Sequence, residues 1–530
     1  MNCLPAQTIR VVTIKQPTSA ERSSSDMFGD EKYAGISASE IDTGAQLVAG
    51  LTSTLEPDEA LRIRKKIDRH VMPLMCVLFG IQLVDKITLG SAAILGIQQA
   101  THLTVNEFNW LGTAFYLGYI LFEYPQNLAL QRFPVGKWMS INIFVWAIAL
   151  ACHAACKNFR ELLVVRLLLG VCEGSNTAGF LIVGSMFYTR TEQTLRVGYW
   201  SMMLGSAQVF SGFISFGVLH IHTSWFEPWQ WLMVITGMIT MILAILFWFL
   251  FPDSPTNAWF LTHDERVKAV QRIKENQTGV ENKHFKMGQM IEALTDIKTW
   301  LFALLAALCN VPTSVLNQQS LILVSFGFNS LQTTLLSCIT GVIQFLVVFT
   351  AVRLAARWPN ARAYVGAIFY IPGWLGVLLI NLVPWSNRAG LLAGQYLSAF
   401  PVPGFVLALS WLNNVTAGHT KRVVTNATIL SAYCVGNATG PLMWKAQYKP
   451  RNHIPWAVIG TCYVVCPLLL LVIRAVLVRE NRIRDAEPVG EGEEYVIERI
   501  EEDGKCVKVK VDKEFLDLTD RQNRDFRYVL

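Results

Sequence analysis

An acid and a base stand side by side in the middle of the first long apolar run of this 530-residue chain. Asp85 and Lys86 lie within residues 73–97, and a stretch of that length crosses a bilayer, which takes roughly 20 helical residues. A charged side chain at the centre of a spanning helix costs about 2.5–3.5 kcal/mol on insertion scales. Charges kept at that depth indicate a pathway for an ion or a charged substrate.

Neighbouring residues on a helix point about 100° apart, so Asp85 and Lys86 do not face the same surroundings. One side chain faces a cavity while the other reaches a neighbouring span. We assign Lys86 to the binding of a substrate anion, and Asp85 to proton coupling or gating. The alternative for both residues is a charge pair that only holds the first span in place.

A second set of charges lies in the fourth apolar run, residues 162–187. Arg166, Gly170 and Glu173 are spaced i, i+4 and i+7 and therefore share one helical face. The guanidinium of Arg166 suits a carboxylate, which makes it a candidate for substrate binding, with helix packing or outer gating as the alternative. Glu173 lies deeper in the run, and intramembrane carboxyl groups are typical of proton relays. We predict that Glu173, ahead of Asp85, is the proton-coupling group.

The composition is that of a protein with many membrane spans. Hydrophobic residues make up 52% of the chain and charged residues 16%, against about 25% charged residues in soluble domains. Twelve apolar runs are long enough to span a bilayer: 73–97, 108–129, 137–156, 162–187, 197–219, 229–251, 299–322, 332–354, 362–383, 389–411, 423–444 and 453–478. The sequence therefore predicts an all-α membrane protein with twelve transmembrane helices.

A polar segment divides the twelve runs six and six, which is the plan of two related bundles about a central cavity. We predict five parts: an N-terminal tail with an amphipathic helix (1–70), a six-helix bundle (71–251), a central loop (252–298), a second six-helix bundle (299–478) and a C-terminal tail (479–530). Three further predictions concern the polar parts: disorder over 1–54, a capped helix over 257–276, and a short strand pair within 494–515.

Lysine and arginine concentrate in alternate loops, so the net charge of +6 indicates topology and not nucleic-acid binding. The loops 98–107, 220–228 and 323–331 contain neither residue. The central loop, by contrast, is rich in both: Arg266, Lys268, Arg272, Lys274, Lys283 and Lys286. The positive-inside rule places both termini and the central loop in the cytoplasm.

Several stretches of the chain resemble motifs of a known family. Arg132-x-x-x-Gly136-Lys137 and Arg166-x-x-x-Gly170 are similar to motifs of the major facilitator superfamily. A closer resemblance is to the fungal allantoate permease family, within the anion:cation symporters. It is carried by stretches spread over roughly residues 60–480, among them Lys66-Ile67-Asp68-Arg69-His70, Asp85-Lys86-Ile87-Thr88-Leu89-Gly90, Glu123-Tyr124-Pro125-Gln126-Asn127 and Gly436-Asn437-Ala438-Thr439-Gly440-Pro441.

The resemblance implies a secondary carrier that imports a small organic anion, such as nicotinate or allantoate, together with protons. It also implies a multi-pass protein of the plasma membrane that works as a monomer. Its expected partners are the anion, protons and the lipid bilayer. The alternatives are an exporter of a fungal secondary metabolite and a nutrient sensor. No metal-ligand cluster, phosphate-binding loop or nucleophile triad is visible, so we predict neither an enzyme, nor a cofactor, nor a metal.

The remaining candidate residues follow from the resemblance and from where it fails. The stretch after Glu173, Gly174-Ser175-Asn176-Thr177-Ala178-Gly179, departs from the family pattern, so Asn176 is a candidate for a changed substrate contact. The seventh and tenth runs contain no charge, so recognition there must use polar groups: Asn310, Asn317, Gln318, Gln319 and Gln395. We assign conformational gating to the motif residues Glu123, Arg132, Gly136 and Lys137.

Overall fold

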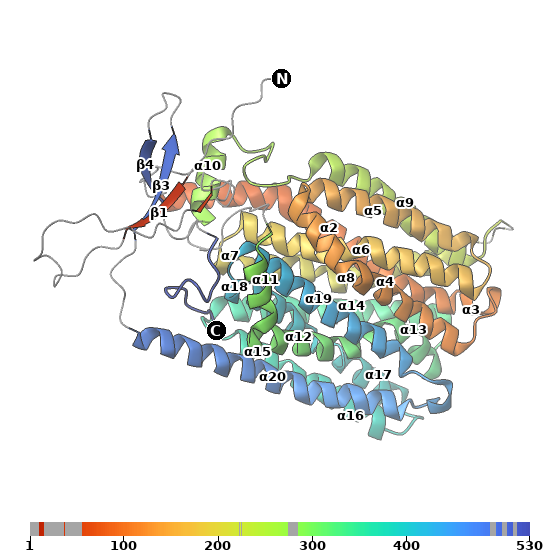
Figure 1. Cartoon of the computed structure of the whole chain (residues 1–530). Helices are drawn as coiled ribbons and strands as arrows, with labels where there is room; N and C mark the ends of the chain where they lie inside the picture. The colour runs from red at the N-terminus through yellow and green to blue at the C-terminus, as the bar shows by residue number, and fades with distance from the viewer. Residues whose placement is uncertain are drawn as a thin grey trace, which may run out of the picture.

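Each of the twelve apolar runs forms one long helix or two consecutive helices in the computed structural model of the chain (Figure 1). The structure describes residues 10–14, 36–37, 56–221, 223, 225–273, 285–487, 494–500, 506–511 and 517–530. The first six runs form α2 (Pro57–Ile94), α4 (Val105–Arg132), α5 (Val135–Cys152), α6 (Phe159–Phe187), α7 (Arg190–Ser201) with α8 (Met203–Val218), and α9 (Pro228–Leu250); the short α3 (Ile97–Ala100) and η2 (His153–Ala155) lie in loops.

The last six runs form a second set of helices, and three of these runs are interrupted. They are α12 (Ile297–Asn310), η4 (Val311–Thr313) and α13 (Ser314–Ser325), then α14 (Ser330–Arg357), α15 (Arg362–Ile368) with α16 (Tyr370–Leu382), α17 (Arg388–Leu397) with α18 (Val402–Val415), α19 (His419–Leu442), and, after η5 (Ala446–Tyr448), α20 (His453–Ala486). The predicted all-α membrane architecture is confirmed.

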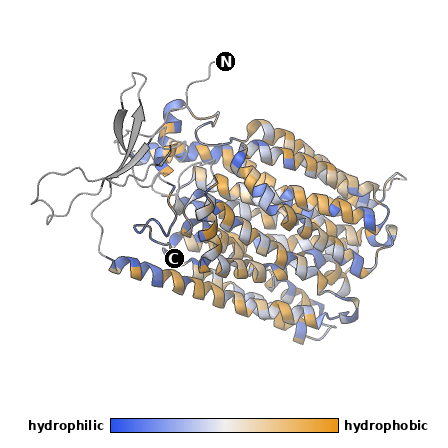
Figure 2. Ribbon diagram, viewed as in Figure 1, coloured by the Kyte–Doolittle hydropathy of each residue, from blue (hydrophilic) through white to orange (hydrophobic). Residues whose placement is uncertain are grey.

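Hydrophobic residues are spread along the long helices, and hydrophilic residues gather toward the helix ends (Figure 2). Ten helical stretches among the described residues are long and apolar enough to cross a membrane. The helices α4 and α19 fall short of that criterion because polar residues are spread along them. The helix α4 of the first half packs against α19 of the second half. Much of the surface of these two helices is therefore covered by protein, whereas other helices expose more of theirs to lipid.

The helix bundle has two opposite ends, which we call the tail end and the far end (Figure 1). At the tail end, α2 begins and α20 finishes; at the far end lies α3. The amphipathic segment predicted before residue 73 forms the first turns of α2, which passes through Pro73 without a break. Proline is tolerated within a spanning helix where neighbouring helices and local adjustments satisfy the freed backbone groups.

Two helices of the central segment are each attached to a different half. The predicted capping box of Thr262 and Glu265 is present, but the helix is shorter than the predicted 257–276. The helix α10 (His263–Arg272) begins only after the capping box, residues 257–262 are not helical, and residues 274–276 lie outside the described residues. It lies on the first half. Lys66 Nζ lies 2.6 Å from Glu265 Oε2. The helix α11 (Met287–Thr295) lies on the second half, where Glu292 Oε1 pairs with Lys421 Nζ at 2.8 Å. Each half therefore has its own polar anchor at the tail end.

The two tails meet in a small sheet with the strand order β2-β1-β3-β4. The strand β1 (Arg10–Ile14) pairs antiparallel with β3 (Glu494–Ile500), which pairs in turn with β4 (Cys506–Val511). The strand pair predicted within 494–515 is thus confirmed. The disorder predicted for residues 1–54 is wrong for β1 and for β2 (Ile36–Ser37), which the sheet orders; the rest of that segment lies outside the described residues.

The last described segment, residues 517–530, packs beneath the tail end of the second half. The buried carboxylate of Asp520 accepts hydrogen bonds from Lys298 Nζ at 2.6 Å and from Tyr528 Oη at 2.6 Å, and it pairs with Lys421 Nζ at 2.6 Å. Burial alone would raise the pKa of Asp520, but the two ammonium groups outweigh burial and hold that pKa well below its usual range. Nothing in the sequence pattern predicted this docked segment.

The two halves touch at both ends and leave a space between them. At the far end, Asn109 Nδ2 donates to Trp444 O at 2.9 Å, and Gln318 Nε2 donates to Asn109 Oδ1 at 2.9 Å. At the tail end, Gly198 lies so close to Val352 that an added Cβ would meet its Cγ1 at 2.3 Å. The space between these contacts is the cavity described next.

Candidate functional site

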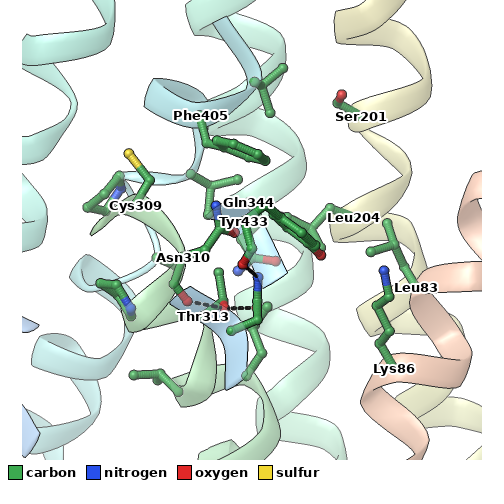
Figure 3. A pocket seen from close by; sticks show the side chains of 18 of the residues that line it. Leu83, Lys86, Ser201, Leu204, Cys309, Asn310, Thr313, Gln344, Phe405 and Tyr433 are labelled. Carbon is green, nitrogen blue, oxygen red and sulfur yellow. Dashed lines mark hydrogen bonds between the residues drawn. The ribbon is translucent and has the colours of Figure 1, made fainter. Parts of the chain in front are cut away.

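A cavity lies between the two halves, with walls from both (Figure 3). Its volume is about 180 Å³, counted as the positions open to the centre of a water-sized sphere. Since one water needs roughly 10–15 Å³ on that measure, the space is sized for a small molecule and not for a single ion. Aromatic side chains form much of its wall: Phe79, Tyr116, Trp200, Phe405, Tyr433 and Tyr463.

Three of the helix interruptions lie at the level of the cavity. The lining includes Ser201 at the break between α7 and α8, Asn310 and Pro312 at the break between α12 and α13, and Ser398 and Pro401 before α18. A broken helix exposes backbone groups, which a membrane protein tolerates only where protein or a cavity surrounds them. The breaks therefore supply polar backbone to the cavity wall.

Lys86 is the only charged side chain among the described residues that line the cavity. Its Nζ lies 2.8 Å from Glu173 Oε1, and Glu173 itself is fully buried behind it on α6. The ammonium also lies over two rings, 5.7 Å from the centroid of Phe115 and 5.8 Å from that of Tyr433. The cation facing the cavity is thus balanced by a carboxylate that the cavity does not reach.

Asp85 points the other way, as the 100° separation predicts. It is 1% exposed and does not line the cavity. The indole Nε1 of Trp146, on α5, donates a hydrogen bond to Asp85 Oδ2 at 2.6 Å. This tie between α2 and α5 lies within the first half.

Arg166 and Asn176, both predicted to bind substrate, are buried in α6 and do not line the cavity. Arg166 lies close enough to Asp85 and Glu173 to interact with both electrostatically, and its Nε and Nη2 have no hydrogen-bond partner among the described residues. Both polar atoms of the Asn176 side chain also lack such a partner. The neighbouring Thr177 is the residue of this stretch that reaches the cavity.

The second half faces the cavity with amide and hydroxyl groups. The lining includes four of the five polar residues predicted for the seventh and tenth runs: Asn310, Asn317, Gln319 and Gln395. Gln319 Nε2 donates to Thr340 Oγ1 at 2.7 Å, and Gln319 Oε1 accepts from Gln208 at 3.1 Å. The fifth residue, Gln318, points away from the cavity toward Asn109 in the far-end contact.

The four predicted gating residues lie toward the tail end and not at the cavity. The carboxylate oxygen Oδ1 of Asp253, which follows α9, accepts from the backbone N–H groups of Gly136 at 3.0 Å and Lys137 at 3.3 Å. Lys137 also donates to the carbonyl of Trp248. Arg132 is exposed at the end of α4. Glu123 is buried, and its Oε1 accepts from Asn127 Nδ2 at 2.6 Å.

Sequence reasoning missed most of the aromatic wall and the partner of Asp85. Trp146, Trp200 and Tyr433 lie in apolar runs, where aromatic residues are common and give no signal of their own. Gln344, Thr313 and Asn437 also line the cavity, and Thr313 Oγ1 donates to Asn437 Oδ1. These three residues could be noticed in the sequence as polar residues within apolar runs. The sequence does not show, however, which side of each helix faces the cavity.

The model of the Major Facilitator Superfamily matches residues 74–441, which takes in all of the residues described around the cavity except Tyr463. The chain belongs to this superfamily. Its curated relatives include the thiamine pathway transporter THI73 of Saccharomyces cerevisiae, 34% identical over 94% of this chain and 92% of that protein. The allantoate permease of the same yeast is 32% identical over 89% of this chain and 87% of that protein. The predicted family is therefore confirmed.

The solved structures agree on the fold. The proton:xylose symporter XylE, bound to 6-bromo-6-deoxy-D-glucose, superposes with a TM-score of 0.62 at 14% identity and covers 76% of this chain and 94% of its own. Twelve transmembrane helices in two six-helix halves are the fold of this superfamily. The chain is accordingly a multi-pass membrane transporter of a small molecule, and not an enzyme.

Proposed function

We propose that this transporter imports a small organic anion together with protons. The observation that carries the proposal is the ion pair of 2.8 Å between Lys86, the charged residue on the cavity wall, and the buried Glu173. While Glu173 is ionised, it neutralises Lys86, and the cavity holds little attraction for an anion. A proton on Glu173 removes that neutralisation and leaves the ammonium free to bind a carboxylate.

The same geometry couples the binding of the proton to the binding of the anion, and the coupling is favourable, as a symporter requires. A proton and an anion stabilise each other's binding, because each one compensates the charge that the other leaves in a low-dielectric site. Without both ligands, the Lys86–Glu173 pair re-forms. Amide and hydroxyl groups of the second half, led by Gln319, would bind the polar remainder of the substrate, and the aromatic wall would cover its faces.

The membrane potential sets a minimum number of protons. It is worth about 2.3 kcal/mol per charge per 100 mV and favours inward movement of positive charge. One proton with a monoanion is electrically neutral, so a substrate drawn in by the potential needs at least two protons. We place the tail end in the cytoplasm, following the positive-inside rule, and the protein in the plasma membrane.

The test is uptake of labelled nicotinate and allantoate, within a carboxylate panel, by yeast that lacks its own carriers for them. We expect saturable accumulation in acidic medium that a protonophore abolishes. Lys86→Ala should abolish it as well. If the protein reaches the surface and no anion accumulates, the import proposal is wrong, and the large aromatic wall then favours an exporter of a bulky metabolite, to be sought as resistance conferred by expression.

A further inference from the structure

A second buried carboxyl lies on α4, apart from the charged cluster of α2 and α6. Glu123 is 1% exposed. Its Oε1 accepts from Asn127, its Oε2 has no hydrogen-bond partner, and it forms no salt bridge, all among the described residues. An ionised carboxylate is not stable when it is buried with a single amide as its only donor and no cation. These surroundings favour the protonated form of Glu123.

The position of Glu123 relates it directly to Glu173. Gly174 follows Glu173 on α6, and a Cβ added to Gly174 would lie 3.7 Å from Glu123 Oε2 and 3.6 Å from Tyr119 Cδ1. Both are ordinary contact distances, so the Glu123 carboxyl and the Tyr119 ring lie against the turn of α6 that carries Glu173.

Counted along its own helix, Glu123 lies fewer residues from the tail end than Glu173 does. Both α4 and α6 run from the far end to the tail end. Glu123 is nine residues from the last residue of α4 (132 − 123), whereas Glu173 is fourteen residues from the last residue of α6 (187 − 173). At about 1.5 Å per residue, these separations are roughly 13 Å and 21 Å. A proton that leaves Glu173 for the cytoplasm must travel in the direction of Glu123.

Tyr119 lies near both Glu123 and a residue of the cavity wall. Its hydroxyl is buried, lies beside the cavity residue Thr177, and is close enough to Glu123 for electrostatic interaction. Two titratable groups interact with Glu123 electrostatically: Tyr119 on the same helix and Cys434 on α19. Glu173 is one residue before Gly174, which the Glu123 carboxyl and the Tyr119 ring approach. Of these groups, the Tyr119 hydroxyl is the one that also lies beside the cavity wall, at Thr177.

We propose that Glu123 is a second proton-binding carboxyl, which accepts the proton of Glu173 and passes it toward the tail end. Glu123 first loses its own proton to the tail side. It then regains one from Glu173 by way of the Tyr119 hydroxyl, which donates its proton to Glu123 and takes one from Glu173. Glu173, now ionised, re-forms its pair with Lys86 and expels the anion. This step rests on the proposed function, in which Glu173 holds the coupling proton.

The protonation of Glu123 has a test that needs no substrate. In the purified protein in lipid vesicles, the infrared difference between H₂O and D₂O contains a C=O stretching band for each protonated carboxyl group that exchanges. We expect Glu123→Gln to remove one such band and Asn127→Ala to shift it without removing it. Glu107→Gln, a matched control on the same helix, keeps its capping box and should leave the spectrum unchanged. An unchanged spectrum for both Glu123→Gln and Asn127→Ala would overturn the inference.

A transport measurement separates this inference from the proposed function. With nicotinate and allantoate as probes, Glu123→Gln should keep the exchange of labelled for unlabelled anion and lose at least tenfold of the proton-driven accumulation. If Glu173→Gln becomes insensitive to the protonophore while Glu123→Gln accumulates normally, the inference fails and the proposed function stands. If Glu173→Gln stays fully protonophore-sensitive, the proposed function fails. If neither probe is carried, the infrared result alone decides for Glu123, and Glu123→Asp serves where the glutamine variant does not fold.

Discussion

At the residue scale, the charge balance around Lys86 determines how the cavity responds to a proton. Asp85, Lys86, Arg166 and Glu173 contribute two negative and two positive charges. Together they are neutral when both acids are ionised, and they carry one positive charge when Glu173 is protonated. A single carboxylate restores neutrality in that second state. Under the proposed function, the cluster is therefore matched to a substrate with one negative charge near Lys86.

The Glu173→Gln variant imitates the protonated state permanently. Because the amide cannot neutralise Lys86, we expect the anion to bind without a proton and to exchange across the membrane, but not to accumulate. The measurement is counterflow of labelled nicotinate compared with net uptake, with and without a protonophore. Net uptake that still collapses on addition of the protonophore would contradict this role for Glu173.

The hydrogen bond from Trp146 to Asp85 should be worth more than a similar bond nearby. Trp146→Phe leaves a buried carboxylate without its donor, and losing a bond to a charged group costs about 1.5–3 kcal/mol. Trp138→Phe is the matched control, because its Nε1 donates to the neutral amide of Gln126, a bond worth about 0.5–1.5 kcal/mol. Thermal unfolding of the purified variants compares the two; equal losses would show that Asp85 is not ionised.

The charges of this cluster could be found in the sequence because an ionisable residue stands out in an apolar run. Their partners could not. Trp146 is 61 residues away from Asp85 and lies among other apolar residues, so no local pattern connects the two. The same holds for Arg166: its place in the sequence predicts a helical face, but only the packing of α6 decides whether that face borders the cavity.

At the element scale, the packing of α4 on α6 depends on glycines at the crossing. A Cβ on Gly118 would lie 2.2 Å from Leu167 O, and one on Gly170 would lie 1.9 Å from Phe115 O. Without a hydrophobic driving force inside a membrane, such close backbone contact is what holds two helices together. It also fixes the distance between Glu123 and the turn of Glu173.

Gly170→Ala should therefore separate α4 from α6, lower the thermal stability and abolish uptake. Gly184→Ala is the control on the same helix, since a Cβ there meets nothing within 4 Å. Size-exclusion chromatography of fluorescent fusions after heating measures both variants. Equal melting of the two would show that the crossing tolerates a methyl group.

The hydropathy pattern predicted where the spans lie but not where they break. An interruption such as the one around Pro312 changes the direction of the backbone without changing the mean hydropathy of the run. Three of the breaks line the cavity, so the part of the fold that hydropathy misses is the part nearest to the cavity. The polar character of α4 and α19 could be predicted, because both runs contain amide residues.

At the scale of the whole molecule, the docked segment 517–530 ties together helices that are far apart in the sequence. Asp520 links Lys298 of α12 with Lys421 of α19, and Trp411 Nε1 of α18 donates to Val529 O at 2.7 Å. A short segment of mixed polarity has no periodic pattern, so its docking could not be predicted from the sequence. Its partners became evident only when the helices were placed.

Asp520→Asn should destabilise the second half at neutral pH by about 3 kcal/mol, because it leaves two buried ammonium groups with less compensation. The folded-state pKa of Asp520 is lowered, so this stabilisation is complete above the usual value of about 4 and is lost as the pH falls through the lowered pKa. The difference in thermal stability between wild type and variant, measured from neutral to acidic pH, should shrink only below about pH 4. The exposed Asp525→Asn is the control; a difference independent of pH would contradict the assignment.

The contacts of the central segment and of the tail sheet suggest that the protein could be assembled from two separate polypeptide fragments. Among the described residues, the ion pairs of α10 all join it to the first half, and the ion pair of α11 joins it to the second. A backbone cut between these two helices would therefore divide none of these pairs. The strands β1 and β3 would then belong to different polypeptides and still pair with each other. Two separately synthesised fragments would thus each carry one strand of this pair, β1 in the N-terminal fragment and β3 in the C-terminal one. The pairing of the two strands would help the fragments to associate.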